Sequence, residues 1–426
     1  MQKVGNKPYI SVNYTFDGLT PAGLPEDLCY KLNQYYEQKL RQDKTAHDKI
    51  EFEIIFNTYD FMTDTRLKEL AEYGFDDVEI SQLRNALFEI AKQTLEHYDE
   101  ICEEDLRSLG QLTELRHELR KHAPLAETNV MKLYSYIDEL LDSIKDHGTP
   151  QFTRQARCAF MARSFCRTLV EKGYFTKQEM DDFMLSIPTV ASEFERDFDL
   201  YSHGKLSRDD FNHLYGHLRL GTYDIRSDSY RNIYFDVASA NLTGNNKVKQ
   251  EAKSLDLERL QVALDEAGIP VTPEKFIEFI KKATQNREYF KFEFTKSLSL
   301  MLDVIVKLGE VMAIAREDMS YLEIQDLLSY HSRDSYIQTI ETRRRFYHVN
   351  SYLVLPEVIF DVGDIDVIDI DEARPNFITN KVVEAPIVNL DEDHDSDITG
   401  KIVALTKADP GYDWIFAKDI AGFVTK

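Results

Sequence analysis

A glycine-containing polar stretch at residues 214–227, LYGHLRLGTYDIRS, holds side chains that can do chemistry together: His217, Arg219, Tyr223 and Asp224. Gly216 and Gly221 permit tight turns, so we expect a loop between helices. There, an arginine can hold a carboxylate or phosphate bidentately, and a histidine can exchange a proton. Alternatively, these groups tie the loop to the fold. The residue types alone favour that alternative, because buried polar groups are usually satisfied within the protein.

A second cationic pattern occupies residues 286–296, NREYFKFEFTK. On a helix, Arg287 and Lys291 would lie one turn apart on one face, with Glu288 beside them. That arrangement suits either an anion-binding face or an ordinary solvated face with ion pairs. The second interpretation is favoured, because surface ion pairs are common and weak.

Two further charged patterns are less specific. In residues 47–54, HDKIEFEI, Glu51 and Glu53 could serve acid–base chemistry, although Lys49 can simply pair with either carboxylate. Residues 343–345 are three arginines in an acidic chain, suited either to a phosphate group or to balancing charge at an interface.

The common enzyme signatures are missing from the sequence. It has no GxxxxGK[ST], GxGxxG, HExxH or GxSxG motif. No cysteine pair has zinc-like spacing, and the thiols are Cys29, Cys102, Cys158 and Cys166. We therefore expect no metal site in this stretch, and reduced thiols in a cytoplasmic protein.

The charge balance narrows the class of partner. Lysine and arginine number 51 against 75 acidic residues, which gives a net charge of −24. This acidity opposes nonspecific binding to nucleic acids and anionic membranes, but a local basic pocket can still bind a small phosphorylated ligand. The sequence shows no signal-like apolar start and no uncharged run long enough to cross a membrane, so we expect no membrane partner.

The pattern of apolar residues predicts helices over most of residues 1–350. Helical faces run from Val130 to Ile144, from Cys158 to Leu169 and from Leu298 to Met312. Start signals are Thr272 with Pro273, and a capping box formed by Ser320 and Glu323. The segment PYISVNY reads as a strand, KIEFEIIFNTY is ambiguous between strand and helix, and residues 239–256 read as a polar loop.

Beyond Asn350 the sequence changes to short β-rich runs separated by glycine, proline and aspartate. We place a boundary within residues 350–375. The predicted fold class is mainly α with an α/β C-terminal piece: a multi-helix domain over residues 1–350 and a second domain beginning at 351.

The C-terminal segment GKIVALTKADPGYDWIFAKDIAGFVTK, together with PNFIT at residues 375–379, resembles the start of the phosphohistidine domain of PEP-utilising phosphotransferases. This family includes PEP synthase, pyruvate phosphate dikinase and rifampicin phosphotransferase. The segments HDKIEFEI, YGHLRLGTYDI, REYFKFEFTKSLS and AREDMSYLEI resemble the middle region of PEP-synthase-like members. Leu220 departs from the proline that the subgroup would have, which suggests a looser turn.

The resemblance implies a swivelling domain whose histidine relays phosphate from ATP to pyruvate or another small acceptor. That histidine would follow Lys426 within a Gly-Gly-x-x-Ser-His motif, and His394 does not match it. A nucleotide-binding domain, in cis or in trans, ATP and Mg²⁺ belong to the parent enzyme, so we expect residues 1–426 alone to be inactive. The helical domain would bind the acceptor, which makes that role for His217, Arg219 and Asp224 as credible as the structural one.

A different class of function stays open. The alternative is a non-catalytic ligand-binding or scaffolding module that works with a separate nucleotide-binding subunit. The sequence names neither the acceptor nor the oligomeric state. Uptake of label from ATP or PEP would separate the two readings.

Overall fold

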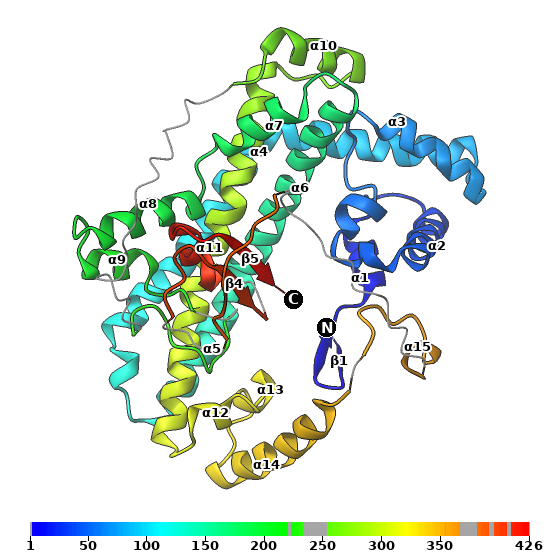
Figure 1. Cartoon of the computed structure of the whole chain (residues 1–426). Coiled ribbons are helices and arrows are strands. Elements are labelled where there is room, and N and C mark those ends of the chain that lie inside the picture. The colour runs from blue at the N-terminus through cyan, green and yellow to red at the C-terminus, as the bar shows by residue number, and fades with distance from the viewer. Residues whose placement is uncertain are drawn as a thin grey trace.

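The protein is a mainly helical structure with a small C-terminal sheet, as predicted (Figure 1). This computed structural model describes residues 2–219, 223–232, 254–353, 355–366, 381–391, 396–406 and 410–425. The N-terminal half contains β1(Gln2–Val4), β2(Lys7–Tyr9), α1(Val12–Leu19), α2(Glu26–Gln42), η1(Lys44–Asp48), η2(Ile50–Ile54), α3(Thr63–Arg66), η3(Leu67–Tyr73), α4(Asp77–Lys121), η4(Pro124–Ala126), α5(Val130–His147), α6(Thr149–Glu171), α7(Lys177–Leu185), α8(Val190–Ser202) and α9(Arg208–Tyr215). Then follow α10(Leu257–Ala267), α11(Pro273–Val311), α12(Arg316–Met319), α13(Ile324–Leu327), α14(Arg333–Asn350), α15(Gly363–Asp366), β3(Ile387–Asn389), β4(Ile402–Leu405), η6(Pro410–Ala417) and β5(Gly422–Thr425).

Two long helices, α4 and α11, form the frame on which the other elements pack (Figure 1). Helix α4 begins at a capping box, in which Asp76 accepts the Glu79 N–H and Glu79 accepts the Asp76 N–H. Helix α11 begins where the sequence predicted, because the Thr272 side chain accepts the Lys275 N–H and Pro273 takes the first helical position. The packing of α4 on α11 brings Arg116 of α4 against Glu293 and Ser297 of α11.

The apolar residues divide into separate cores. One core joins α1 and α2 to α6, α7, α10 and the first halves of α4 and α11. A second joins α5 to the C-terminal halves of α4 and α11 and to α14. A smaller aromatic cluster sits under α8 and α9 and contains Phe194, Phe198, Phe211, Tyr215 and Tyr230, with Phe292 and Trp414 packed against it.

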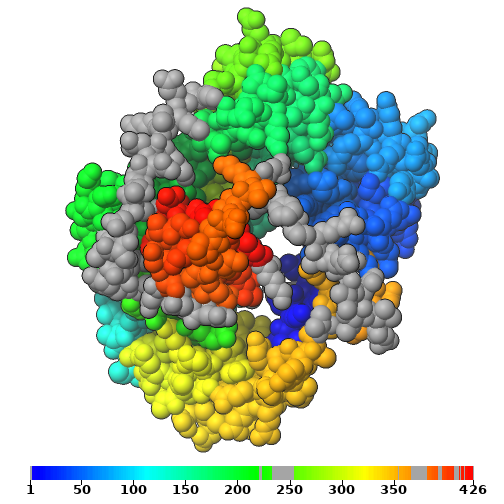
Figure 2. All heavy atoms as spheres, viewed as in Figure 1, coloured from blue at the N-terminus to red at the C-terminus, as the bar shows by residue number. Residues whose placement is uncertain are grey.

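The C-terminal sheet has three parallel strands in the order β3-β4-β5, with its own small core around Val403 and Ile415. The 3₁₀ segment η6 packs against α8, so this piece lies on the helical body. Figure 2 shows these residues, orange to red, gathered on one face of the molecule. The segment between α14 and the sheet still packs on the helices at Val358, which is buried in the first core.

Several local predictions are wrong or only partly right. Ser320 does not start a helix; Glu323 is the N-cap of α13, and its N–H donates to Asp326. Of PYISVNY only the first residues are in a strand, β2, and a helix begins at Val12. The ambiguous KIEFEI forms a single π-helical turn, η2. Most of the predicted loop at 239–256, as well as PNFIT, Leu220, Gly221 and His394, lies outside the described residues.

Candidate functional site

The loop after α9 doubles back on itself and is fastened to the aromatic cluster. Arg219 and Ser229 form an antiparallel bridge, and the Tyr230 N–H donates to the Leu218 carbonyl at 2.7 Å. Tyr230 is fully buried among the rings of α8 and α9. Arg316 adds a second fastening, since its Nε donates to the Ile225 carbonyl at 2.6 Å. The turn predicted from sequence is therefore a fixed element beside α11.

Arg219 is buried, and its guanidinium group bonds to other residues of the protein. Its Nε and Nη2 donate to the side chain and carbonyl of Ser299 at 3.2 and 3.0 Å, and its Nη1 donates to the Ser227 carbonyl at 2.7 Å. It also forms an ion pair with Asp303. With these donors engaged, Arg219 joins the loop to α11, as the structural alternative proposed.

His217, two residues before Arg219, is also buried, but one of its ring nitrogens is not hydrogen-bonded. The imidazole is buried, its ring packs edge-on to Phe292 at 4.6 Å between centroids, and its Nε2 has no hydrogen-bond partner. Burial holds the pKa of His217 well below 6.5, and the positive charges of Lys296, Arg116 and Arg120 lower it further. His217 is therefore neutral at physiological pH, with one polar nitrogen unsatisfied.

The groups around His217 carry an excess of positive charge. We call the set the cationic cluster; it consists of His217 with Arg116, Arg120, Arg231 and Lys296. Arg116 and Lys296 share one carboxylate, that of Glu293, at 3.4 and 2.5 Å. Among the described residues, neither Arg120 nor Arg231 has a side-chain hydrogen bond or ion pair, and both residues are exposed at the edge of the cluster. The pKa of Arg120 is lowered by partial removal from water and then by repulsion from Arg231 and Arg116.

Such an arrangement is chemically suited to a small anion. Unpaired guanidinium groups and a neutral imidazole can donate hydrogen bonds to a carboxylate, phosphate or sulfate, and a bound anion would offset the mutual repulsion of the cations. It does not suit Mg²⁺, which prefers oxygen ligands. No group of three or more histidine, cysteine or acidic side chains within the described part of the chain is placed to hold a metal ion.

The remaining residues of the loop point to structural roles. Tyr223 has a left-handed backbone with φ of 49°, which suits a tight turn. Asp224 accepts from the backbone and guanidinium of Arg226, at 2.9 and 3.0 Å. This pair is at the surface, where it closes the turn.

Arg287 and Lys291 lie on another part of α11. At about 100° per residue, Arg287 is half a turn away from Lys296, so it faces away from the cationic cluster. It lines a pocket of about 730 Å³ together with Glu51, Phe52 and Arg163, and it pairs with Glu288 at 2.7 Å. Lys291 is half-buried and has no polar partner among the described residues. The six predicted site residues therefore do not form one site.

Sequence reasoning missed most of the cationic cluster. Arg116 and Arg120 are four residues apart in LRHELRK, a spacing that places both on one helical face. Their proximity to His217, about a hundred residues later, follows only from the packing of α4 on α11.

Comparison with protein-family models, curated proteins and solved structures finds no match for this chain. The resemblance to the PEP-utilising phosphotransferases therefore stays a prediction. Among the helices that the structure describes, none combines the length and apolar character needed to cross a membrane.

Proposed function

We propose that this chain supplies the acceptor-binding body of an ATP-dependent, PEP-synthase-like phosphotransferase, and that the cationic cluster binds the anionic acceptor or the phosphate delivered to it. The observation that carries the proposal is the buried, unpartnered Nε2 of His217 surrounded by four cationic side chains. Burying an unsatisfied polar atom costs stability, and a bound anion that accepts a hydrogen bond from this nitrogen would offset that cost.

This assignment changes the roles expected from sequence. Arg120 and Arg231, which have no acidic partner among the described residues, replace Arg219 and Arg287 as the groups that hold the acceptor. His217 can donate a hydrogen bond to a bound oxyanion and can accept a proton once the anion raises its pKa. Arg219 holds the loop in place and does not touch the ligand.

The position of the C-terminal piece supports the proposal. Trp414 packs both against the aromatic cluster and against the core of the sheet. Phe292, which contacts His217, packs on the same aromatic cluster. The piece that resembles a phosphohistidine domain thus packs on the same aromatic cluster as the ring that contacts His217, on the side from which a carrier domain would need to approach an acceptor.

Isothermal titration calorimetry at low ionic strength tests the binding step. The ligands are sulfate, phosphate, pyruvate and phosphoenolpyruvate, titrated into residues 1–426 as wild type and as an Arg120→Gln, Arg231→Gln double variant. We expect at least one anion to bind, and the double variant to bind it about tenfold or more weakly, because each lost charge-assisted hydrogen bond is worth about 1.5–3 kcal/mol.

The matched control is Arg107→Gln, on the same helix, where the guanidinium donates only to the Glu103 carbonyl at 3.4 Å. It should bind like wild type. Absence of binding by all four anions, or equal binding by the double variant, would refute the site.

The transfer step has a separate test. The full-length parent enzyme, incubated with ATP labelled at the β-phosphate or with labelled PEP, should acquire an acid-labile phosphohistidine. Anion binding without any labelling would reject the phosphotransferase assignment and favour the alternative of a non-catalytic ligand-binding module.

A further inference from the structure

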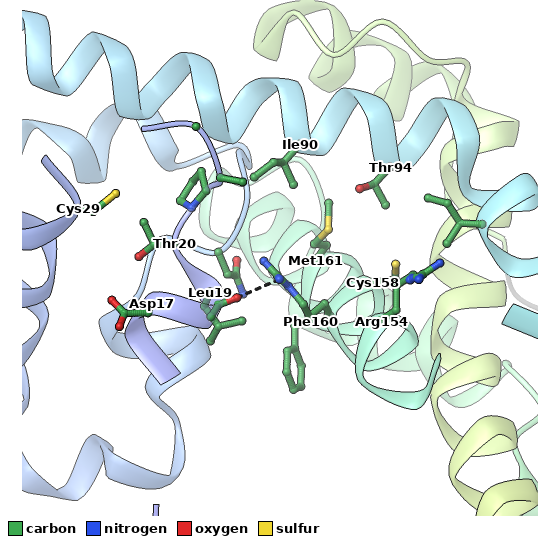
Figure 3. Close-up of a pocket in the computed structure, with 17 residues that line it drawn as sticks. Asp17, Leu19, Thr20, Cys29, Ile90, Thr94, Arg154, Cys158, Phe160 and Met161 are labelled. Carbon is green, nitrogen blue, oxygen red and sulfur yellow. Dashed lines mark hydrogen bonds between the residues drawn. The ribbon is translucent and has the colours of Figure 1, made fainter. Parts of the chain in front are cut away.

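A second cavity lies between the α1–α2 connection, α4 and α6. Its volume is about 700 Å³, within the range of small-molecule sites. Figure 3 shows Ile90 and Thr94 reaching into it from α4, Met161 from α6, and Leu19 and Thr20 from the connection after α1. Phe160 borders the cavity, but its ring points away from it and packs edge-on to Phe52 at 5.4 Å between centroids. Most of these walls are apolar, so the cavity suits a largely apolar molecule.

One cation in this cavity is left without a counter-charge. Arg157 of α6 is half-buried and makes a single hydrogen bond, from Nη1 to the Gly18 carbonyl at 3.0 Å. Among the described residues it has no acidic partner. Burial lowers the pKa of Arg157, which means that its charge is partly removed from water.

The other arginine of this cavity, Arg154 on the same helix, does have acidic partners. Arg154, at the far end of the cavity, lies 3.2 Å from Asp105 and 3.7 Å from Glu104. Asp17, the cavity's own carboxylate, accepts from the Asn33 amide at 2.5 Å and forms no ion pair with Arg157. A guanidinium has five donors, so Arg157 retains a free edge that fits a carboxylate bidentately.

We propose that this cavity binds a monocarboxylic acid with an apolar body, with the carboxylate on Arg157 and the body against Leu19, Ile90 and Met161. A single unpaired cation selects a single negative charge, and the carboxylate of Asp17 in the cavity wall disfavours a second one. Phosphate dianions and nucleotides are poor candidates for the same reason. The site is independent of the cationic cluster and of the proposed phosphotransfer.

The test uses octanoate and 1-octanol as a matched pair that share the same carbon count and differ in charge. Calorimetric titration into residues 1–426 should show octanoate binding at least tenfold tighter than the alcohol. Acetate, which lacks the apolar body, should bind much more weakly than octanoate.

Three variants locate the contact. Arg157→Gln should weaken octanoate binding about ten- to a hundredfold and leave binding of the alcohol unchanged, whereas Arg157→Lys, which keeps the charge but loses the bidentate fork, should lose less. The control Arg163→Gln lies on the same helix but outside this cavity, with its guanidinium over Phe52. Circular dichroism checks that each variant is folded.

Equal affinity for octanoate and octanol would overturn the proposal, as would failure of octanoate to bind, or an Arg157→Gln variant that binds it as well as Arg163→Gln does. Because sulfate binding is measured at the cationic cluster, failure here leaves the proposed function standing, and the reverse also holds.

Discussion

Replacing Arg219 by alanine distinguishes a structural arginine from a ligand-binding one. The guanidinium makes three hydrogen bonds of 2.7–3.2 Å and an ion pair with Asp303, and its side chain is fully buried. Breaking a buried pair by removing one partner costs about 3–5 kcal/mol, because the remaining charge and acceptors are left uncompensated. Against a total stability of about 5–15 kcal/mol, this is a large loss.

The same loop supplies the control. Arg226 pairs with Asp224 at the surface with 57% of its side chain exposed, so Arg226→Ala should cost about 1 kcal/mol or less. Urea unfolding followed by circular dichroism measures both variants. We expect Arg219→Ala to lower the midpoint strongly while the folded fraction still binds anions. An Arg219→Ala protein as stable as Arg226→Ala, but unable to bind the anion, would refute the structural role and restore the one expected from sequence.

Three other perturbations follow from the structure. The pKa of His217 is depressed in the folded protein, so the unfolded chain takes up a proton first as the pH falls below about 6.5, and stability should decline towards acid. His217→Phe should flatten this decline. Urea midpoints measured at pH 7.5 and at pH 5.5 test this. A Cβ at Gly309 would lie 2.8 Å from Met319 Cγ and 3.0 Å from the Ile314 carbonyl oxygen, so Gly309→Ala should lower the free energy of unfolding in urea by about 1–3 kcal/mol. The control is Gly110→Ala, where a Cβ would have no atom within 4 Å and the change should be neutral or stabilising. Trp414→Ala should expose residues 381–425 to limited proteolysis without changing the unfolding of the helices, and an unchanged digestion pattern would contradict its role in docking.

The parts of the fold that could be predicted are those set by local sequence. Helix α5 follows its apolar stripe from Val130, and it ends at His147, where Gly148 is the C-cap and Pro150 stands in the first turn of α6. The start of α11 at Thr272 and Pro273 has the same local cause. The error at Ser320 arises because this residue is the C-cap of α12, with its hydroxyl donating to the Glu317 carbonyl, so the next helix is capped at Glu323 in a box with Asp326.

The candidate site could be predicted only in part, because its charges come from distant segments. The loop sequence identified His217, but its unsatisfied state depends on Arg116 and Arg120 from α4 and Lys296 from α11. The pairing of Arg219 with Asp303 is equally invisible in sequence. Residue types indicated an anion-binding chemistry; the choice of which arginine is free to perform it required the packing of three elements.

Both candidate sites contain arginines without an acidic partner, which is unexpected in a chain with a large excess of acidic residues. With 75 acidic residues against 51 basic ones, a cation that needs a partner for stability has an ample supply of carboxylates. Arg154 and Arg219 have found theirs, whereas Arg120, Arg157 and Arg231 have none among the described residues. Arg157 is half-buried, so leaving its charge unpaired opposes folding, whereas Arg120 and Arg231 are exposed and water can solvate them. Arginines that are free of carboxylates in so acidic a chain, rather than those in the most elaborate hydrogen-bond networks, are therefore the ones to test as the anion-binding groups of both proposals.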